Sequence, residues 1–184
     1  MRQPLHPRSR KPLSDSDAGM TDRWIPAYIG LGSNLDDPPA QLRGACTALE
    51  KLPATQLIAV SEFYRNPPMG LTDQPDFVNG AAGLLTKMTA FDMLAALKAI
   101  ERAHGRDRKD ASRWGPRPLD LDLLVYGSAR IAREGLTLPH PGIAERNFVL
   151  FPLLEIAPGL TIPGWGQVKD LAARLDRSGL VRLE

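Results

Sequence analysis

The sequence has little cysteine and no long apolar run. Its 184 residues include a single cysteine, Cys46, which excludes an intramolecular disulfide and a cysteine-rich zinc site and is typical of a reducing compartment. No segment reaches the roughly 18–20 apolar residues that cross a bilayer. Residues 1–19 also lack the apolar core of a secretory signal. We therefore expect a cytoplasmic protein that does not contact a membrane.

The charge is nearly balanced, with 23 Lys and Arg residues against 21 Asp and Glu residues. Residues 1–13 contain four of the basic residues and no acid, so the rest of the chain is slightly acidic. The overall charge thus gives no indication of nucleic-acid binding. Residues 1–22 are rich in Pro and Ser, and we expect them to form a disordered basic extension. Residues 23–184 have the length of one domain.

Apolar residues recur at strand and helix spacing from about residue 24 onward. A strand over 27–31 is expected to end at the turn Gly32-Ser33-Asn34. Further strands are predicted at 55–65, 77–85, 119–126 and 131–138, and helices at 38–52, 89–104, 146–157 and within 165–178. Strands and helices that alternate irregularly with short connections indicate an α+β or layered α-β-α domain.

Two aspartates lie close together in the segment Arg117-Pro-Leu-Asp-Leu-Asp-Leu-Leu-Val-Tyr126. Alternation along a strand places Asp120 and Asp122 on one face, and the apolar residues Leu119, Leu121, Leu123 and Val125 on the other. Two carboxylates at this spacing repel each other by about 2.5 kcal/mol at an effective dielectric of about 20. A hard divalent cation removes that repulsion, and oxygen ligands favour Mg²⁺ over zinc. A strand face open to solvent is the alternative.

The loop ahead of these aspartates is strongly basic and contains Arg106, Arg108, Lys109, Arg113 and Arg117. Cationic side chains beside metal-binding carboxylates suit a polyphosphate substrate, because Mg²⁺ bridges phosphate oxygens and arginine neutralises developing charge. His140 and Arg146 follow, although each alone is more typical of a structural or surface residue. No P-loop is present, so a nucleotide would be held by arginines and metal.

Five segments, taken together, resemble the 6-hydroxymethyl-7,8-dihydropterin pyrophosphokinases of folate biosynthesis. They are Tyr28–Leu35, Phe63–Gly70, Asp73–Asn79, Arg113–Asp122 and Leu138–His140. Their order and spacing are similar from about residue 25 to about residue 175. The resemblance implies a single layered α-β-α domain, with a ferredoxin-like, antiparallel-rich sheet and flanking helices. It also implies a monomer that transfers the pyrophosphate of ATP to the pterin and releases AMP.

The resemblance further implies roles for individual residues. The catalytic group is Arg106, Arg117, Asp120 and Asp122, and the two aspartates hold two Mg²⁺ ions. The residues implied to bind ATP are Arg108, Lys109, Arg113, Trp114, His140 and Arg146. Those implied to bind the pterin are Asn66, Pro67, Pro68, Met69, Phe77, Asn79 and Phe148. Three positions depart from the family pattern: Phe77 replaces a frequent tyrosine, Asn66 a frequent threonine and Pro141 a frequent aromatic residue.

Two other functions fit part of the pattern. A nucleic-acid-binding α+β module would use the basic loop and the basic N-terminal segment, but it leaves Asp120 and Asp122 unexplained because they repel phosphate without a metal. The second alternative function is that of a catalytically silent relative that binds a nucleotide. No residue is identified as a general base.

Overall fold

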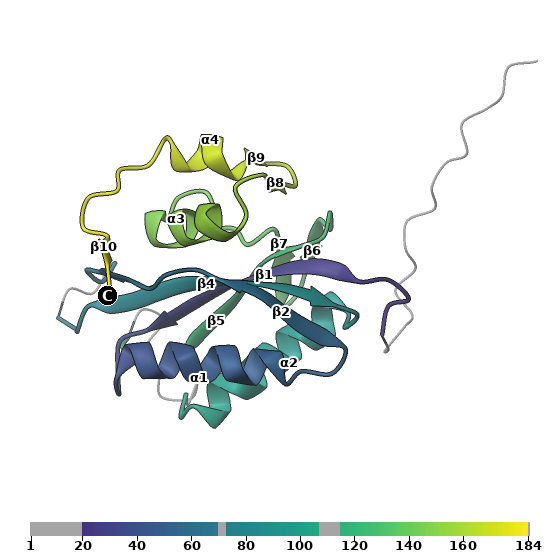
Figure 1. Cartoon of the computed structure of the whole chain (residues 1–184), viewed down its shortest axis with the longest axis horizontal. Coiled ribbons are helices and arrows are strands. Elements are labelled where there is room, and N and C mark those ends of the chain that lie inside the picture. Colours follow the sequence, from purple (N-terminus) through teal and green to yellow (C-terminus); the bar gives the residue numbers. More distant parts are fainter. Residues whose placement is uncertain (1–19, 70–72, 107–114, 184) are drawn as a thin grey trace, which may run out of the picture.

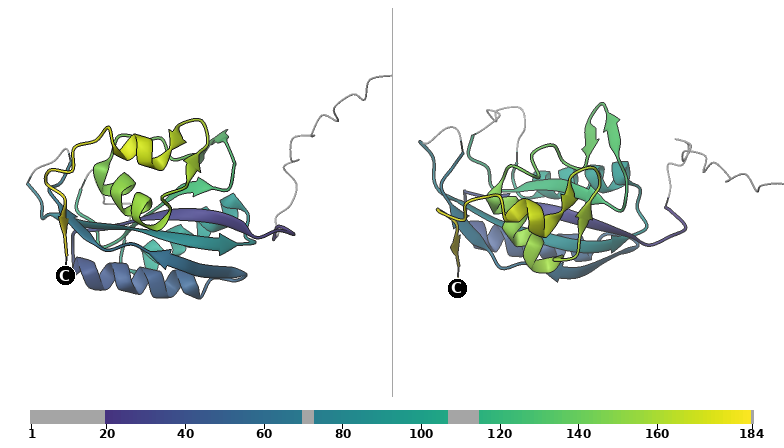
Figure 2. Two further views of the ribbon diagram at one scale, coloured as in Figure 1. Left: turned by 45° about the horizontal axis from the view of Figure 1, so that its top comes forward. Right: turned by 90° about the horizontal axis from the view of Figure 1, so that it is seen from above.

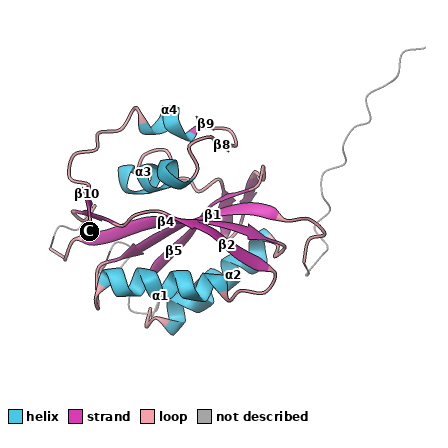
Figure 3. Ribbon diagram, in the orientation of Figure 1, coloured by secondary structure: helices cyan, strands magenta, loops and turns pink. Residues whose placement is uncertain are grey.

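The computed structural model describes residues 20–69, 73–106 and 115–183. Within these ranges the chain forms an α+β domain in which helices cover both faces of an antiparallel sheet (Figure 1; Figure 3). Its helices are α1 (Pro38–Glu50), α2 (Ala90–Ala103), α3 (Asn147–Ile156) and α4 (Val168–Ala172). Its strands are β1 (Ile25–Ser33), β2 (Thr55–Val60), β3 (Tyr64–Asn66), β4 (Phe77–Thr86), β5 (Asp120–Tyr126), β6 (Ile131–Arg133), β7 (Leu136–Leu138), β8 (Thr161–Ile162), β9 (Gly166–Gln167) and β10 (Val181–Arg182).

The predicted fold class is confirmed. None of the described helices is long and apolar enough to pass through a bilayer. Most of the predicted N-terminal extension, residues 1–19, lies outside the described residues. Thr21 already contacts the domain, since its backbone N–H donates to the carbonyl of Lys87 over 2.6 Å.

The main sheet has the strand order β10-β3-β4-β1-β5, and β2 pairs with the remaining part of β4. Its register aligns three residues in one row, because Gly32 of β1 pairs with Asn79 of β4 on one side and with Asp120 of β5 on the other. Adjacent strands lie about 4.8 Å apart, so Asn79 and Asp120 are separated by about 10 Å. The glycine between them leaves the middle of the row without a side chain.

Each face of the sheet has its own apolar core. Ile29, Leu31 and Leu123 pack with α1 and α2, which lie together below the sheet in Figure 1. Leu124 and Val125 pack with α3 and α4, which lie above the sheet in Figure 1 and face the viewer in the right-hand view of Figure 2. The prediction that Val125 shares a face with Leu123 is wrong, because the β1–β5 register shifts at Tyr28/Ile29 and the alternation of β5 changes there.

The two long helices begin where local sequence signals place them, although α1 ends at Glu50, two residues before the predicted end. Asp37 caps α1 by accepting a hydrogen bond from the Ala40 N–H (3.2 Å), and Thr89 caps α2 by accepting from the Asp92 N–H (3.2 Å). Gly105 follows α2 with a φ of 84°, a left-handed conformation that favours glycine. Capping therefore confirms both predicted helices.

Four element boundaries differ from the prediction. β1 continues through Gly32 and Ser33, because the pairing of both residues with β4 extends the strand where a turn was expected. The strand predicted over 55–65 is two strands, since Ser61 Oγ accepts the Ala81 N–H (2.9 Å) and interrupts the pairing with β4. The strand predicted over 131–138 is the hairpin β6–β7, which turns at Gly135 (φ 81°). The last helix contains only Val168–Ala172.

Candidate active site

A cavity of about 350 Å³ lies on the side of the sheet that faces α3. The central glycines of β1, Gly30 and Gly32, form part of its lining. The other lining residues come from β1, β3, β4, β5, the loops that follow β3, α2 and β7, the segment before β5 and the start of α3: Leu31, Asn66, Met69, Phe77, Asn79, Gly80, Arg106, Arg117, Asp120, Asp122, His140, Arg146, Phe148 and Val149. The pocket thus brings together most of the site residues proposed from sequence.

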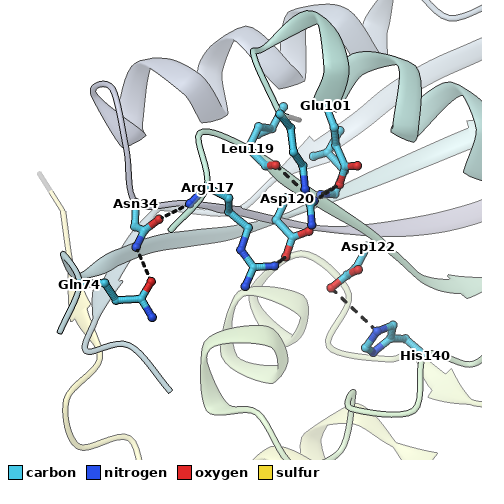
Figure 4. Close-up of polar contacts among 10 residues, drawn as sticks. Asn34, Gln74, Glu101, Arg117, Leu119, Asp120, Asp122 and His140 are labelled. Atoms are coloured by element: carbon cyan, nitrogen blue, oxygen red, sulfur yellow. Dashed lines mark hydrogen bonds and ion pairs between the residues drawn. The ribbon is translucent and has the colours of Figure 1, made fainter. Parts of the chain in front are cut away.

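Asp120 is held by two arginines. Arg117 Nη1 lies 2.8 Å from one carboxylate oxygen, and Arg106 Nη1 forms an ion pair with the other (Figure 4). The Nε atoms of Arg106 and Arg117 are buried and, among the described residues, have no hydrogen-bond partner. Both guanidinium groups are therefore only partly satisfied by the described residues.

Glu101 of α2 supports this arrangement from beneath the pocket. Its side chain is 1% exposed, and it pairs with Arg106 while accepting the backbone N–H of Leu121 over 2.9 Å (Figure 4). The carboxylate therefore connects the end of α2 to β5 beside the aspartates. Sequence reasoning missed this residue. The signal was present, because Met93, Leu97 and Glu101 are four residues apart and share the buried helix face.

Among the described residues, Asp122 has no comparable ion pair with an arginine or lysine. Burial and the neighbouring charge of Asp120 raise its pKa from 3.8 to about 6. His140 Nε2 is 3.9 Å from Asp122 Oδ2 (Figure 4). Burial and the charge of Arg146 lower the pKa of His140, so the imidazole is neutral at pH 7. The Gly142 N–H donates to His140 Nδ1 (3.1 Å), which places the ring proton on Nε2, toward Asp122.

The acidic side chains fit a hard cation that is shared with a substrate. Asp122 is 38% exposed to the pocket, and its raised pKa indicates a carboxylate whose charge is poorly compensated. In the described ranges there is no cluster of three or more His, Cys, Asp or Glu side chains able to hold a metal ion. Two carboxylates with no third protein ligand suit Mg²⁺, which keeps water and substrate phosphates in its coordination shell.

The opposite end of the pocket combines aromatic rings with amides. Phe77 and Phe148 both line it, and the guanidinium of Arg117 lies 5.6 Å from the centroid of the Phe77 ring. Asn79 Nδ2 donates to Asn66 Oδ1 over 2.5 Å. Apolar faces beside a few oriented polar groups are typical of a pocket for a flat heterocycle.

The model of the 7,8-dihydro-6-hydroxymethylpterin-pyrophosphokinase family matches residues 28–158, which is more than half of the chain. The chain belongs to this family. A relative from Pseudomonas aeruginosa is 45% identical over 156 residues, covering 85% of this chain and 95% of the relative. Another, from Methylorubrum extorquens, is 46% identical over 158 residues, covering 86% and 98%. Both are named 2-amino-4-hydroxy-6-hydroxymethyldihydropteridine pyrophosphokinase.

Solved structures show the same fold. Wild-type Plasmodium falciparum HPPK-DHPS with SDX-DHP matches with a TM-score of 0.62 and 13% identity, covering 87% of this chain and 47% of that one. An HPPK-DHPS structure in complex with substrates matches with a TM-score of 0.63 and 12% identity, covering 84% and 43%. This chain therefore spans less than half the length of these longer proteins.

The pyrophosphokinase pocket does not include every residue proposed from sequence. Pro67 and Pro68 are not among its lining residues; Pro67 lies near Gly179 of the C-terminal segment, and its carbonyl accepts a hydrogen bond from Asn66. Four proposed ATP contacts fall outside the described residues: Arg108, Lys109, Arg113 and Trp114.

Asn34 connects the two ends of the pyrophosphokinase pocket and was not proposed from sequence. Its Nδ2 donates to Gln74 Oε1 over 3.1 Å (Figure 4). The same group donates to the Pro75 carbonyl, also over 3.1 Å. Its Oδ1 accepts the Arg117 N–H over 2.7 Å. One buried amide thus joins the segment before β4 to the segment before β5. Nothing in the spacing around Asn34 reveals contacts this distant in sequence.

Glu101→Gln should destabilise the pyrophosphokinase domain by about 1–3 kcal/mol, because Arg106 loses a buried charged partner. Urea unfolding measures this change. The matched control is Glu50→Gln, at an exposed position near the end of α1, for which we expect a change within about 0.5 kcal/mol. Equal unfolding midpoints for Glu101→Gln and the parent would show that the buried carboxylate does not support Arg106.

Asp122 should make the stability of the metal-free protein depend on pH. Its folded-state pKa of about 6 lies above the ordinary value of 3.8, so the folded protein retains a proton that the unfolded chain loses. This residue's contribution to stability is therefore complete below pH 3.8 and is lost as pH rises toward 6. In urea titrations with EDTA, Asp122→Asn should gain stability relative to the parent across this window. Parallel pH curves for the two proteins would contradict the shift.

Proposed function

We propose that this chain transfers the pyrophosphoryl group of ATP to the hydroxymethyl group of 6-hydroxymethyl-7,8-dihydropterin, a step of folate biosynthesis, in the pocket over β1. The observation that carries the proposal is the row Asn79–Gly32–Asp120 in the sheet register. In this row the amide of Asn79 and the carboxylate of Asp120 lie about 10 Å apart on the same side of the sheet. The amide would contact the heterocycle and the carboxylate would bind a metal ion. Family membership supplies the pair of substrates that such a pocket joins.

The pterin is proposed to bind at the amide end. Phe77 and Phe148 would contact the faces of the ring, a geometry worth about 0.5–1.5 kcal/mol beyond area burial. Asn79 would hydrogen-bond the ring edge, and Met69 would close the pocket wall. Phe77 carries no hydroxyl, so at this position the ring contact rests on stacking alone.

The triphosphate is proposed to bind at the acidic end. Asp120 and Asp122 would hold two Mg²⁺ ions, which when bound supply neutralisation of phosphate charge and polarisation of the reacting oxygens. Arg106 and Arg117, which lie beside the aspartates, would contact the phosphoryl oxygens and stabilise charge during transfer. Arg146 and the neutral His140 would bind the phosphates as donors, and Arg108, Lys109, Arg113 and Trp114 are proposed further ATP contacts.

In the proposed reaction, the pterin hydroxyl oxygen forms a bond to the β-phosphorus of ATP. The bond from that phosphorus to the oxygen bridging the α- and β-phosphates breaks, and AMP leaves with the bridging oxygen. The hydroxyl proton is released to solvent. His140 already carries a proton on Nε2, and it therefore acts at that atom as a donor and not as a base.

The pocket is built for small molecules and lies within a single domain. We propose that the protein works as a cytoplasmic monomer without nucleic acid. In the rival nucleic-acid-binding function, phosphates would bind beside Asp122 without a metal. The carboxylate of Asp122 would repel them, which makes that function unfavourable.

Incubation with Mg²⁺, ATP and the hydroxymethyl dihydropterin should yield AMP and the pterin diphosphate in equal amounts, because the β-phosphorus is attacked. Chromatography of the nucleotides measures the products. EDTA should abolish both. Accumulation of ADP would show attack at the γ-phosphorus and would contradict the proposal.

Asp122→Asn should lower the rate of AMP formation by at least about 100-fold, since the metal loses an anionic ligand at the site of charge development. Asp170→Asn, at an exposed position of α4, is the matched control and should retain the parent rate. Circular dichroism checks that both variants are folded. Rapid turnover by folded Asp122→Asn at ordinary Mg²⁺ would eliminate the metal site.

A further inference from the structure

Two buried asparagines form a chain of hydrogen bonds at the amide end of the pocket. Asn66 and Asn79 are each 7% exposed and both line the cavity. Asn79 Nδ2 donates to Asn66 Oδ1 (2.5 Å), and Asn66 Nδ2 donates to the backbone carbonyl of Pro67 (2.9 Å). The two amides come from adjacent strands, since Tyr64 and Asn66 of β3 pair with Asn79 and Phe77 of β4.

The direction of this chain is dictated by its last member. A carbonyl oxygen can only accept, so Asn66 must present its Nδ2 group to Pro67. The Oδ1 atom of Asn66 then points toward Asn79, and Asn79 must donate to it from its own Nδ2 group. The orientation of Asn79, which its isolated amide would leave open to a 180° flip, is thus determined by a neighbour.

This orientation determines what Asn79 offers to a ligand. Its Oδ1 atom accepts no hydrogen bond from the described part of the chain. That oxygen lies against Gly32, where an added Cβ would be only 3.0 Å from it. Asn79 Oδ1 is therefore a fixed acceptor at the floor of the pocket, and it requires a donor from the bound molecule.

We propose that Asn66 is a positioning residue that fixes the amide of Asn79 and makes the pocket select heterocycles with an N–H donor edge. The inference rests on the proposed function, and it identifies the 2-amino group and N3–H of the dihydropterin as that edge. A ring that presents only acceptors there leaves Asn79 Oδ1 unsatisfied and is rejected. Asn66 thus determines specificity through Asn79.

Two variants separate orientation from shape. Asn66→Leu has a similar size but no hydrogen bond, so Asn79 becomes free to flip. Asn66→Asp retains an oxygen that accepts from Asn79 and therefore preserves its orientation, although it loses the donation to Pro67. Gln56→Leu makes the same amide-to-leucine change at an exposed position of β2 and is the control.

The first experiment compares the dissociation constants of three ligands in the presence of Mg²⁺ and a non-hydrolysable ATP analogue. They are the hydroxymethyl dihydropterin, an analogue with hydrogen in place of the 2-amino group, and an analogue with an amino group in place of the 4-oxo group, whose N3 carries no proton. The parent should bind at least one analogue tenfold or more weakly, because a buried acceptor loses its donor. The ratio of that analogue's dissociation constant to the dissociation constant of the hydroxymethyl dihydropterin should fall to threefold or less in Asn66→Leu. It should stay at tenfold or more in Asn66→Asp and Gln56→Leu.

The second experiment uses no ligand. In a ¹⁵N spectrum of the parent, one proton of the Asn79 side-chain NH₂ should be protected from exchange with water. This protection should be lost in Asn66→Leu and retained in Asn66→Asp. If the parent binds no pterin but shows the protected proton, the proposed function fails while the hydrogen-bond chain stands.

Either of two results overturns the inference. One is an unchanged discrimination ratio in Asn66→Leu, which would make Asn66 only a pocket wall. The other is rapid exchange of both Asn79 side-chain protons in the parent, which needs no variant to fold.

Discussion

The register between three antiparallel strands is the constraint on which the site depends. It places Asn79, Gly32 and Asp120 side by side across β4, β1 and β5. Because hydrogen bonding fixes the distance between strands, the two functional ends of the pocket are held about 10 Å apart without relying on loops. A shift of one residue in either pairing would turn one end to the opposite face of the sheet. The apolar cores on both faces prevent that shift.

At the acidic end of the pocket, the two aspartates are compensated unequally by neighbouring charges, and one of the compensating groups is supported by Glu101 on the far side of the sheet. Asp120 and Glu101 share Arg106, and Arg117 completes the pairing of Asp120. Asp122 is left with a raised pKa and a neutral histidine as its neighbour. The site therefore contains one carboxylate that is well compensated and one that gains most from a cation. Such unequal environments are typical of functional sites and are seldom favourable for stability alone.

Much of this arrangement could be predicted from sequence, and the failures have physical causes. Local signals were sufficient for α1 and α2, because Asp37 and Thr89 cap them through short-range hydrogen bonds. The Asp120–Asp122 alternation likewise follows from strand geometry. The extension of β1 through Gly32, by contrast, depends on partners distant in sequence, and glycine there is a pocket floor and not a turn. The Val125 error arose from a register shift, which leaves no mark in the alternation itself.

Residues that act through others were the hardest to find. Asn34 accepts a hydrogen bond from the backbone N–H of Arg117, which lies more than 80 residues further along the chain. Sequence periodicity does not predict a contact of this kind. Glu101 was detectable as an acid on a buried helix face, but its ion pair with Arg106 was not predicted. Family resemblance supplied proposed roles for the residues expected to contact substrates, whereas the hydrogen bonds of Asn34 and Glu101 that support them are seen only in the structure.

We propose that a single row of the sheet spans both substrates. The most direct test replaces Mg²⁺ with Mn²⁺ and measures the paramagnetic relaxation of protons on the bound dihydropterin, with a non-hydrolysable ATP analogue present. We expect strong relaxation, corresponding to a ring edge about 10 Å from the metal. Relaxation no greater than that of a free ligand, or a distance beyond about 20 Å, which is twice the span of the row, would contradict it.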